Sequence, residues 1–140
     1  MGIRFGGASV IAALVFASSA LADGNAMSTE EILNKHLGAF GAGDVDGLME
    51  DYDDSSVILL QSGLLEGTDA IRGMIEALVA EFSKPGMTFG MDTTRVGGNV
   101  GYIVWRAETA DNVYEYGTDT FVFEDGKIRT QTLTFKAIPK

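Results

Sequence analysis

The sequence predicts an α+β domain in which three N-terminal helices pack on a mostly antiparallel sheet. Apolar residues recur with helical spacing as far as Pro85-Gly86, and from there on they alternate with polar residues as in strands. Helices followed by consecutive hairpins are typical of an antiparallel sheet with its helices gathered on one face. The length of 140 residues and the hydrophobic content of 46% suit one domain with a sizeable core.

Residues 1–22 are predicted to be a signal peptide, and residues 23–140 the folded domain. Arg4 precedes an apolar run at residues 10–16, and the small residues of Ala20-Leu21-Ala22 form a cleavage site. The apolar run is too short for a membrane span, which needs about 20 apolar residues. We therefore expect a periplasmic or secreted protein with no membrane contact after cleavage.

Charge and composition exclude several classes of partner and site. The chain has no cysteine and a formal net charge of -10, so disulfides, thiol nucleophiles and thiolate metal sites are excluded. Such a charge repels phosphate backbones and anionic lipids, so we expect no nucleic-acid partner. A single histidine, scattered carboxylates and no phosphate-binding glycine motif predict neither a metal nor a cofactor.

Capping residues mark the ends of the three predicted helices. The first begins at Ser28 or Thr29, with acids in its first turn, and stops at residues 41–43. Asp44 is expected to cap a short second helix whose inward side includes Tyr52. The third helix begins at Thr68 and ends before Pro85-Gly86.

Period-two patterns predict the strands and their turns. The expected strands are Val57–Leu60, Met87–Val96, Val100–Ala107, Val113–Phe123 and Ile128–Phe135. Residues 97–99 and Asp125-Gly126 supply tight hairpin turns, and an Asp-Gly pair between strands is a strong hairpin indicator.

The Asp125-Gly126 turn predicts the register of the last hairpin and, with it, which side chains lie inside. Regular pairing places Phe123 opposite Ile128, Phe121 opposite Thr130, and Asp119 opposite Thr132. The face with these phenylalanines is the apolar one, so Asp119 is expected beneath the helices. The opposite face would carry Tyr114, Tyr116, Thr118, Thr120, Val122, Arg129, Gln131, Leu133 and Phe135. This mixed outer face predicts a homodimer contact.

Asp119 and His36 are the candidate catalytic residues. A buried carboxylate needs a hydrogen-bonding partner or a proton, and the structural alternative is a solvated Asp119 or one bonded to Thr130 or Thr132. His36 lies on the apolar stripe of the first helix, where it is either a proton-transfer group or a satisfied core residue. Trp105 is expected to line a pocket or to belong to the core.

Several sequence segments resemble the SnoaL-like branch of the NTF2-like superfamily, which includes ketosteroid isomerases and polyketide cyclases. They are residues 36–48, 52–57, 65–72 and 118–128. The resemblance implies a cone-shaped α+β fold with a curved sheet around an interior pocket. It places Asp119 where ketosteroid isomerases keep a protonated aspartate, and His36 where they have a pocket tyrosine. Their proton-abstracting aspartate falls at about Leu59 or Leu60.

These observations predict a pocket for a small, mostly apolar carbonyl compound, with Asp119 and His36 as acid and base. The pocket is expected to be lined by Tyr52, Leu59, Trp105, Phe121 and Phe123. An isomerase, cyclase or hydrolase-like activity would follow. The alternative is a non-catalytic ligand-binding or protein-interaction module, which the missing base favours. The sequence leaves both hypotheses open, because this fold hosts many functions.

Overall fold

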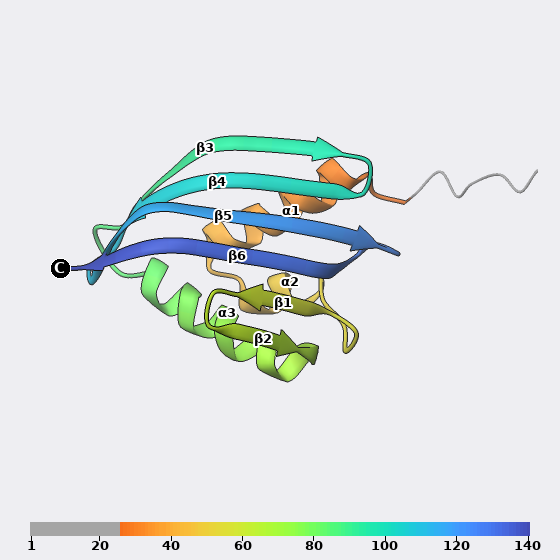
Figure 1. Cartoon of the computed structure of the whole chain (residues 1–140), viewed down its shortest axis with the longest axis horizontal. Coiled ribbons are helices and arrows are strands. Elements are labelled where there is room, and N and C mark those ends of the chain that lie inside the picture. The colour runs from red at the N-terminus through yellow and green to blue at the C-terminus, as the bar shows by residue number, and fades with distance from the viewer. Residues whose placement is uncertain (1–25) are drawn as a thin grey trace, which may run out of the picture.

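The computed structural model describes residues 26–140, so the predicted signal peptide lies outside the described residues. These residues form three helices and six strands, in which two helices precede a short hairpin and the third helix precedes four long strands (Figure 1). The helices are α1 (Thr29–Ala42), α2 (Val45–Met49) and α3 (Gly67–Phe82). The strands are β1 (Val57–Leu60), β2 (Gly63–Glu66), β3 (Thr88–Gly97), β4 (Val100–Glu108), β5 (Asn112–Glu124) and β6 (Lys127–Pro139).

One mixed sheet runs in the order β2-β1-β6-β5-β4-β3. Its strand pairs are antiparallel except β1 and β6, which are parallel. The predicted class, an α+β fold with helices on a curved and mostly antiparallel sheet, is confirmed. Strand β2 was not predicted, because it is four residues long and mostly exposed and so lacks a clear alternating pattern.

The ends of α1 and α2 follow the predicted capping chemistry, whereas α3 begins at Gly67 without a side-chain cap. Ser28 caps α1 in a reciprocal capping box with Glu31, and Gly43 ends the helix in the left-handed conformation with φ of 68°. Asp44 caps α2 by accepting a hydrogen bond from the Gly47 amide. These caps fix where α1 stops and where the chain turns toward the residues that follow α2.

The Asp125-Gly126 turn forms as predicted, but the register beyond it differs. Phe123 pairs with Ile128, whereas Phe121 pairs with Gln131 because a β-bulge leaves Arg129 as an extra residue on β6. One extra residue reverses which side chains face inward. The prediction that Gln131, Leu133 and Phe135 lie on the outer face was therefore wrong, as was the pairing of Asp119 with Thr132; Asp119 pairs with Leu133.

A second bulge near the start of β5 has the same effect on Tyr114. Tyr114 pairs with Ala137 and Tyr116 with Lys136, so Glu115 is the extra residue. Tyr114 is consequently buried against Phe135, at 5.4 Å between ring centroids, rather than on the outer face as predicted. Tyr116 remains exposed on that face.

The core lies between the helices and the inner face of the long strands. Its buried residues come from all three helices and from β1, β4, β5 and β6. Figure 1 shows α3 beside the short β1–β2 hairpin, at the edge of the sheet opposite β3. No helix within residues 26–140 is long and apolar enough to cross a bilayer. The homodimer contact through the outer face stays a prediction.

Candidate functional site

A cavity of about 80 Å³ lies between the helices and the inner face of the sheet. Its wall is mostly apolar and comes from α1, α2, α3 and the four long strands. Five side chains with polar atoms also line it: His36, Tyr52, Trp105, Asp119 and Gln131. A concave apolar site with a few converging polar groups is the usual form of a small-molecule site.

Asp119 stands at the centre of a buried hydrogen-bonded chain. Trp105 Nε1 donates to its Oδ2 at 2.9 Å, and Gln131 Nε2 donates to its Oδ1 at 2.8 Å. Tyr52 in turn donates its hydroxyl proton to Oε1 of Gln131 at 2.5 Å. Each of these hydrogen bonds joins a donor to an acceptor, so the series from Tyr52 to Asp119 fixes the orientation of the Gln131 amide.

Burial controls the ionisation of Asp119. Removal from water raises the pKa of this carboxyl, and the hydrogen bonds from Trp105 and Gln131 and the charge of His36 lower it only in part. The resulting pKa lies above the ordinary value. Burial, reinforced by the charges of Asp119 and Asp51, also raises the pKa of Tyr52 well above its usual range. Tyr52 therefore remains a donor.

The sheet geometry explains why Asp119 has these partners. Trp105 pairs with Gly117 on β5, and Gln131 on β6 pairs with Phe121, so both are diagonal neighbours of Asp119 on the same face. Asp119 is 6% exposed, as its predicted inward placement requires. Neither of the predicted threonine partners bonds to Asp119, because the bulge at Arg129 moves Gln131 into the place expected for Thr130.

His36 forms a second polar unit with Asp51. Its Nδ1 lies 2.9 Å from Oδ2 of Asp51, and both side chains are buried. Lys35 Nζ contacts the other oxygen of Asp51 at 3.1 Å and reaches Glu50 at the same distance. Burial raises the pKa of Asp51, but the hydrogen bonds from His36 and Lys35 outweigh it and hold this pKa below its ordinary value. Asp51 is thus a carboxylate at neutral pH.

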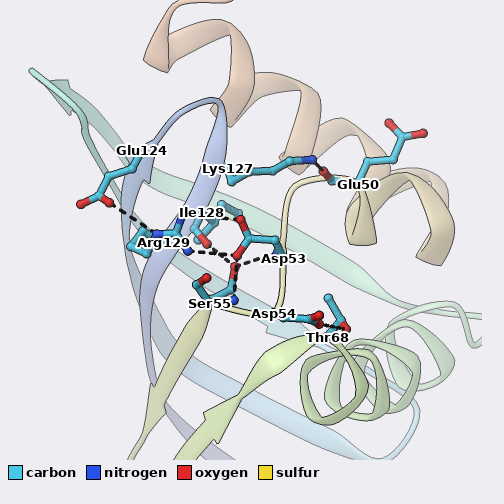
Figure 2. A network of polar contacts seen from close by, with 10 residues as sticks. Glu50, Asp53, Asp54, Ser55, Thr68, Glu124, Lys127, Ile128 and Arg129 are labelled. Atoms are coloured by element: carbon cyan, nitrogen blue, oxygen red, sulfur yellow. Dashed lines mark hydrogen bonds and ion pairs between the residues drawn. The ribbon is translucent and has the colours of Figure 1, made fainter.

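The segment that carries Asp51 is fixed to the β5–β6 hairpin. The Ile128 amide donates to the Asp51 carbonyl at 2.7 Å, and Ser56 Oγ donates to the Ile128 carbonyl at 2.7 Å. Figure 2 shows the neighbouring contacts, in which Arg129 pairs with Asp53 at 2.9 Å and Lys127 Nζ donates to the Glu50 carbonyl. The bulged start of β6 therefore holds Asp51 and Tyr52 in place from outside the cavity.

Aromatic contacts join the two polar units. The His36 ring meets Tyr52 and Phe121 edge to face, with ring centroids 5.7 and 5.4 Å apart. His36 on α1 is therefore packed between residues of the segment after α2 and of β5. An imidazole bonded to an ionised Asp51 and a buried carboxyl of raised pKa thus line one cavity, and such a set can hold and move a proton.

The structure brings together most of the predicted site residues. Tyr52, Trp105 and Phe121 line the cavity with His36 and Asp119, while their roles toward a ligand stay predictions. Leu59 was wrong as a lining residue: it is 45% exposed on β1 and lies away from the cavity. Phe123 is buried, but it stacks on Phe121 in the core without reaching the cavity.

Sequence reasoning missed Asp51, Gln131 and Lys35. Asp51 is separated from His36 by fifteen residues, a spacing that no local pattern links. Gln131 was assigned to the wrong face because a bulge was not expected. The one available indication in the sequence was a break in the period-two alternation of β6 before Gln131, which a bulge can cause. Within residues 26–140, no group of three or more His, Asp or Glu side chains is placed to hold a metal ion.

Comparison with solved structures places the fold. An NTF2-like protein of unknown function from Mesorhizobium loti has a TM-score of 0.67 at 25% identity, covering 77% of this chain and 90% of that one. A candidate ketosteroid isomerase from Kribbella flavida DSM 17836 has a TM-score of 0.63 at 12% identity, with 77% of each chain covered. A de novo designed protein with a curved β-sheet has a TM-score of 0.66 at 12% identity, covering 79% of this chain and 88% of that one.

These likenesses establish the NTF2-like architecture. No match was found among curated proteins. The family model of the SnoaL-like domain matches residues 33–131, which span α1 to β6 and include every polar residue of the cavity. This chain belongs to the SnoaL-like domain family.

Proposed function

We propose that this chain binds a small neutral carbonyl compound in the cavity and moves a proton at the carbon next to the carbonyl group. One observation carries the proposal. His36, backed by the ionised Asp51, and Asp119, whose pKa is raised, both line one cavity that is otherwise mostly apolar. The SnoaL-like fold also suggests an isomerase-like or ligand-binding function.

His36 is suited to the role of general base. Because Asp51 is ionised, the ring nitrogen that faces it must carry the proton, and Nδ1 donates. The lone pair then lies on Nε2, on the far side of the ring. Among the described residues no side-chain nitrogen or oxygen is buried without a partner, so Nε2 keeps access to open space, which the cavity provides.

Asp119 is suited to binding the carbonyl oxygen. When protonated it donates a hydrogen bond to that oxygen, while its two oxygens still accept from Trp105 and Gln131. In the proposed step the C–H bond beside the carbonyl breaks and its proton moves to Nε2 of His36. The electron pair passes into the carbonyl group, and Asp119 stabilises the enolate oxygen. Return of a proton from Nε2 to the same carbon regenerates the carbonyl compound, with exchange or inversion at that carbon.

The size and charge of the site limit the ligand. A cavity of about 80 Å³ is roughly half the volume that holds benzene in an engineered protein, so it accepts a head group of a few heavy atoms. A mostly apolar cavity disfavours a charged carboxylate, which would lose its hydration there. A neutral ketone or aldehyde fits both limits.

The test is exchange of the hydrogens next to the carbonyl of 2-butanone for deuterium in D₂O, followed by proton NMR. The wild type is expected to exchange faster than buffer. His36→Gln should lower the catalysed rate by roughly 10²- to 10⁴-fold, the usual contribution of a general base. Tyr116→Phe, on the exposed outer face, should leave it unchanged. An exchange rate equal to that of buffer in the wild type would rule out proton transfer.

The alternative is a binding module without turnover. It is favoured by the position at which ketosteroid isomerases hold their base, because that position falls at about Leu59 or Leu60 and is apolar in this chain. In that case 2-butanone would perturb the fluorescence of the single tryptophan, Trp105, while its hydrogens exchange no faster than in buffer.

A further inference from the structure

A larger groove lies directly outside the cavity. Its volume is about 310 Å³, and it is formed by α3, the turn after β1, and β6. Gln61 and Ser62 from the turn and Glu81 from α3 line it, together with Ala77. The groove opens to solvent, so it is a route by which a molecule could reach the interior.

The cavity and the groove share one wall. Four side chains line both hollows: Met74, Leu78, Leu133 and Phe135. Met74 and Leu78 are one turn apart on α3, and Leu133 and Phe135 point to the same face of β6. Because the same side chains border both spaces, the partition is a single layer of side chains.

Met74 makes this partition adjustable. Met74 and Leu78 are only partly buried, and methionine is unbranched with three rotatable bonds. A rotation of its side chain would join the two hollows without a change in the backbone. The inner cavity alone is far below the ~300–1,000 Å³ of ordinary ligand pockets, whereas the two volumes together fall inside this range.

We propose that the cavity and the groove form one elongated site that takes a neutral, unbranched carbonyl compound, its head in the cavity and its alkyl chain passing Met74 into the groove. The orientation of the head rests on the proposed function. The chain must be narrow, because it passes between α3 and β6.

The outer end of the groove sets the charge of the ligand. Burial raises the pKa of Glu81, but hydrogen bonds from Asn112, Tyr114 and Thr109 outweigh it, so Glu81 is ionised. The whole chain adds a net charge of -10. Glu81 would repel a carboxylate at the end of the ligand's tail, and the tail is therefore uncharged.

The probe is a series of straight-chain 2-ketones from 2-butanone to 2-decanone, titrated into the full chain. Trp105 is the only tryptophan and lines the cavity, so its fluorescence reports head-group binding. Each methylene that enters the groove should tighten binding by about 4-fold, from the transfer free energy of a buried CH₂. Branching beside the carbonyl should abolish this gain.

Two matched variants test the place of the tail. Ala77 lines the groove and Ala80 lines neither hollow, although both are exposed on α3. Ala77→Phe should remove the dependence on chain length but leave the Kd of 2-butanone unchanged, whereas Ala80→Phe should behave as the wild type. Both keep the single-tryptophan readout.

The outcomes separate the two proposals. If 2-butanone binds but longer ketones bind no tighter, the elongated site is wrong and the proposed function stands. If the length dependence survives Ala77→Phe as it does Ala80→Phe, the tail lies elsewhere and the elongated site is also wrong. If no ketone of any length binds, the proposed function itself fails.

Discussion

The indole ring of Trp105 lies over the backbone of Gly117, so close that a β-carbon on Gly117 would come within 2.1 Å of the ring. The two residues are paired across β4 and β5. A glycine at this position lets the ring lie flat against the strand, which directs Nε1 to Asp119 at 2.9 Å. Gly117 thus positions the tryptophan and, through it, the buried carboxyl.

Gly117→Ala is expected to displace Trp105 and to break its hydrogen bond to Asp119. Overpacking of this kind costs about 1–3 kcal/mol in the free energy of unfolding, measured by urea denaturation. The near-ultraviolet circular dichroism of the single tryptophan should change as well. Gly73→Ala is the control, because nothing lies within 4 Å of that helical position and the exchange should stabilise α3 by about 0.5–1 kcal/mol. Equal effects of the two changes would contradict the role of Gly117.

Tyr52→Phe tests the buried series of hydrogen bonds that leads from Tyr52 through Gln131 to Asp119. The change removes the donor to Gln131 Oε1 and leaves a buried amide oxygen without its partner, at a cost of about 1–3 kcal/mol. Tyr116→Phe, which removes a hydroxyl from the exposed outer face, should stay within about 0.5 kcal/mol of the wild type. A Tyr52→Phe protein as stable as the Tyr116→Phe protein would show that the hydrogen bond from Tyr52 to Gln131 contributes nothing to the stability of the fold.

The sequence was sufficient for the features that depend on neighbouring residues. The helix start at Ser28, its stop at residues 41–43 and the Asp125-Gly126 turn each follow from chemistry within a few residues, and each formed as expected. The inward placement of Asp119 also followed, because alternation along β5 is regular between Gly117 and Phe123.

The partners of Asp119 and His36 depend on distant contacts and were not predictable in this way. The bulge at Arg129 forms where the start of β6 is bonded to the segment after α2, through Ile128 with Asp51 and Ser56. That contact joins residues more than seventy positions apart. It moves Gln131 to the inside and fixes Asp51 behind His36, so one tertiary contact accounts for both of these omissions.

Asp119 should make the stability of the protein fall as pH rises. Its pKa in the folded state lies above the ordinary value of 3.8, so the unfolded chain releases this proton at a lower pH than the folded one. The contribution of Asp119 is therefore complete below about pH 4 and is lost as pH rises through the folded pKa. Asp119→Asn removes this dependence, and the Tm of the variant minus that of the wild type should increase with pH.

The measurement is a set of melting curves between pH 3.5 and 8 at constant ionic strength. Asp125→Asn, which removes the same charge from the exposed hairpin turn, corrects for the change in net charge. A difference between Asp119→Asn and wild type that does not vary with pH would mean that the carboxyl ionises as freely inside the protein as outside it.

Asp51 should act with the opposite sign. Its pKa in the folded state is held below 3.8, so its contribution to stability is present above that pH and is lost as pH falls through the folded pKa. Asp51→Asn keeps an acceptor for His36 but loses the charge that both His36 and Lys35 contact, which costs about 1.5–3 kcal/mol at pH 7.

Glu50→Gln is the control: it removes the other partner of Lys35, at a side chain that is 68% exposed, and should cost under about 1 kcal/mol. The cost of Asp51→Asn should shrink as the pH is lowered below 4 in urea denaturation, since the wild-type carboxylate then takes up its proton. A cost that stays constant to pH 3 would mean that Asp51 acts through its shape and neutral hydrogen bonding, and that His36 is not oriented by a charge.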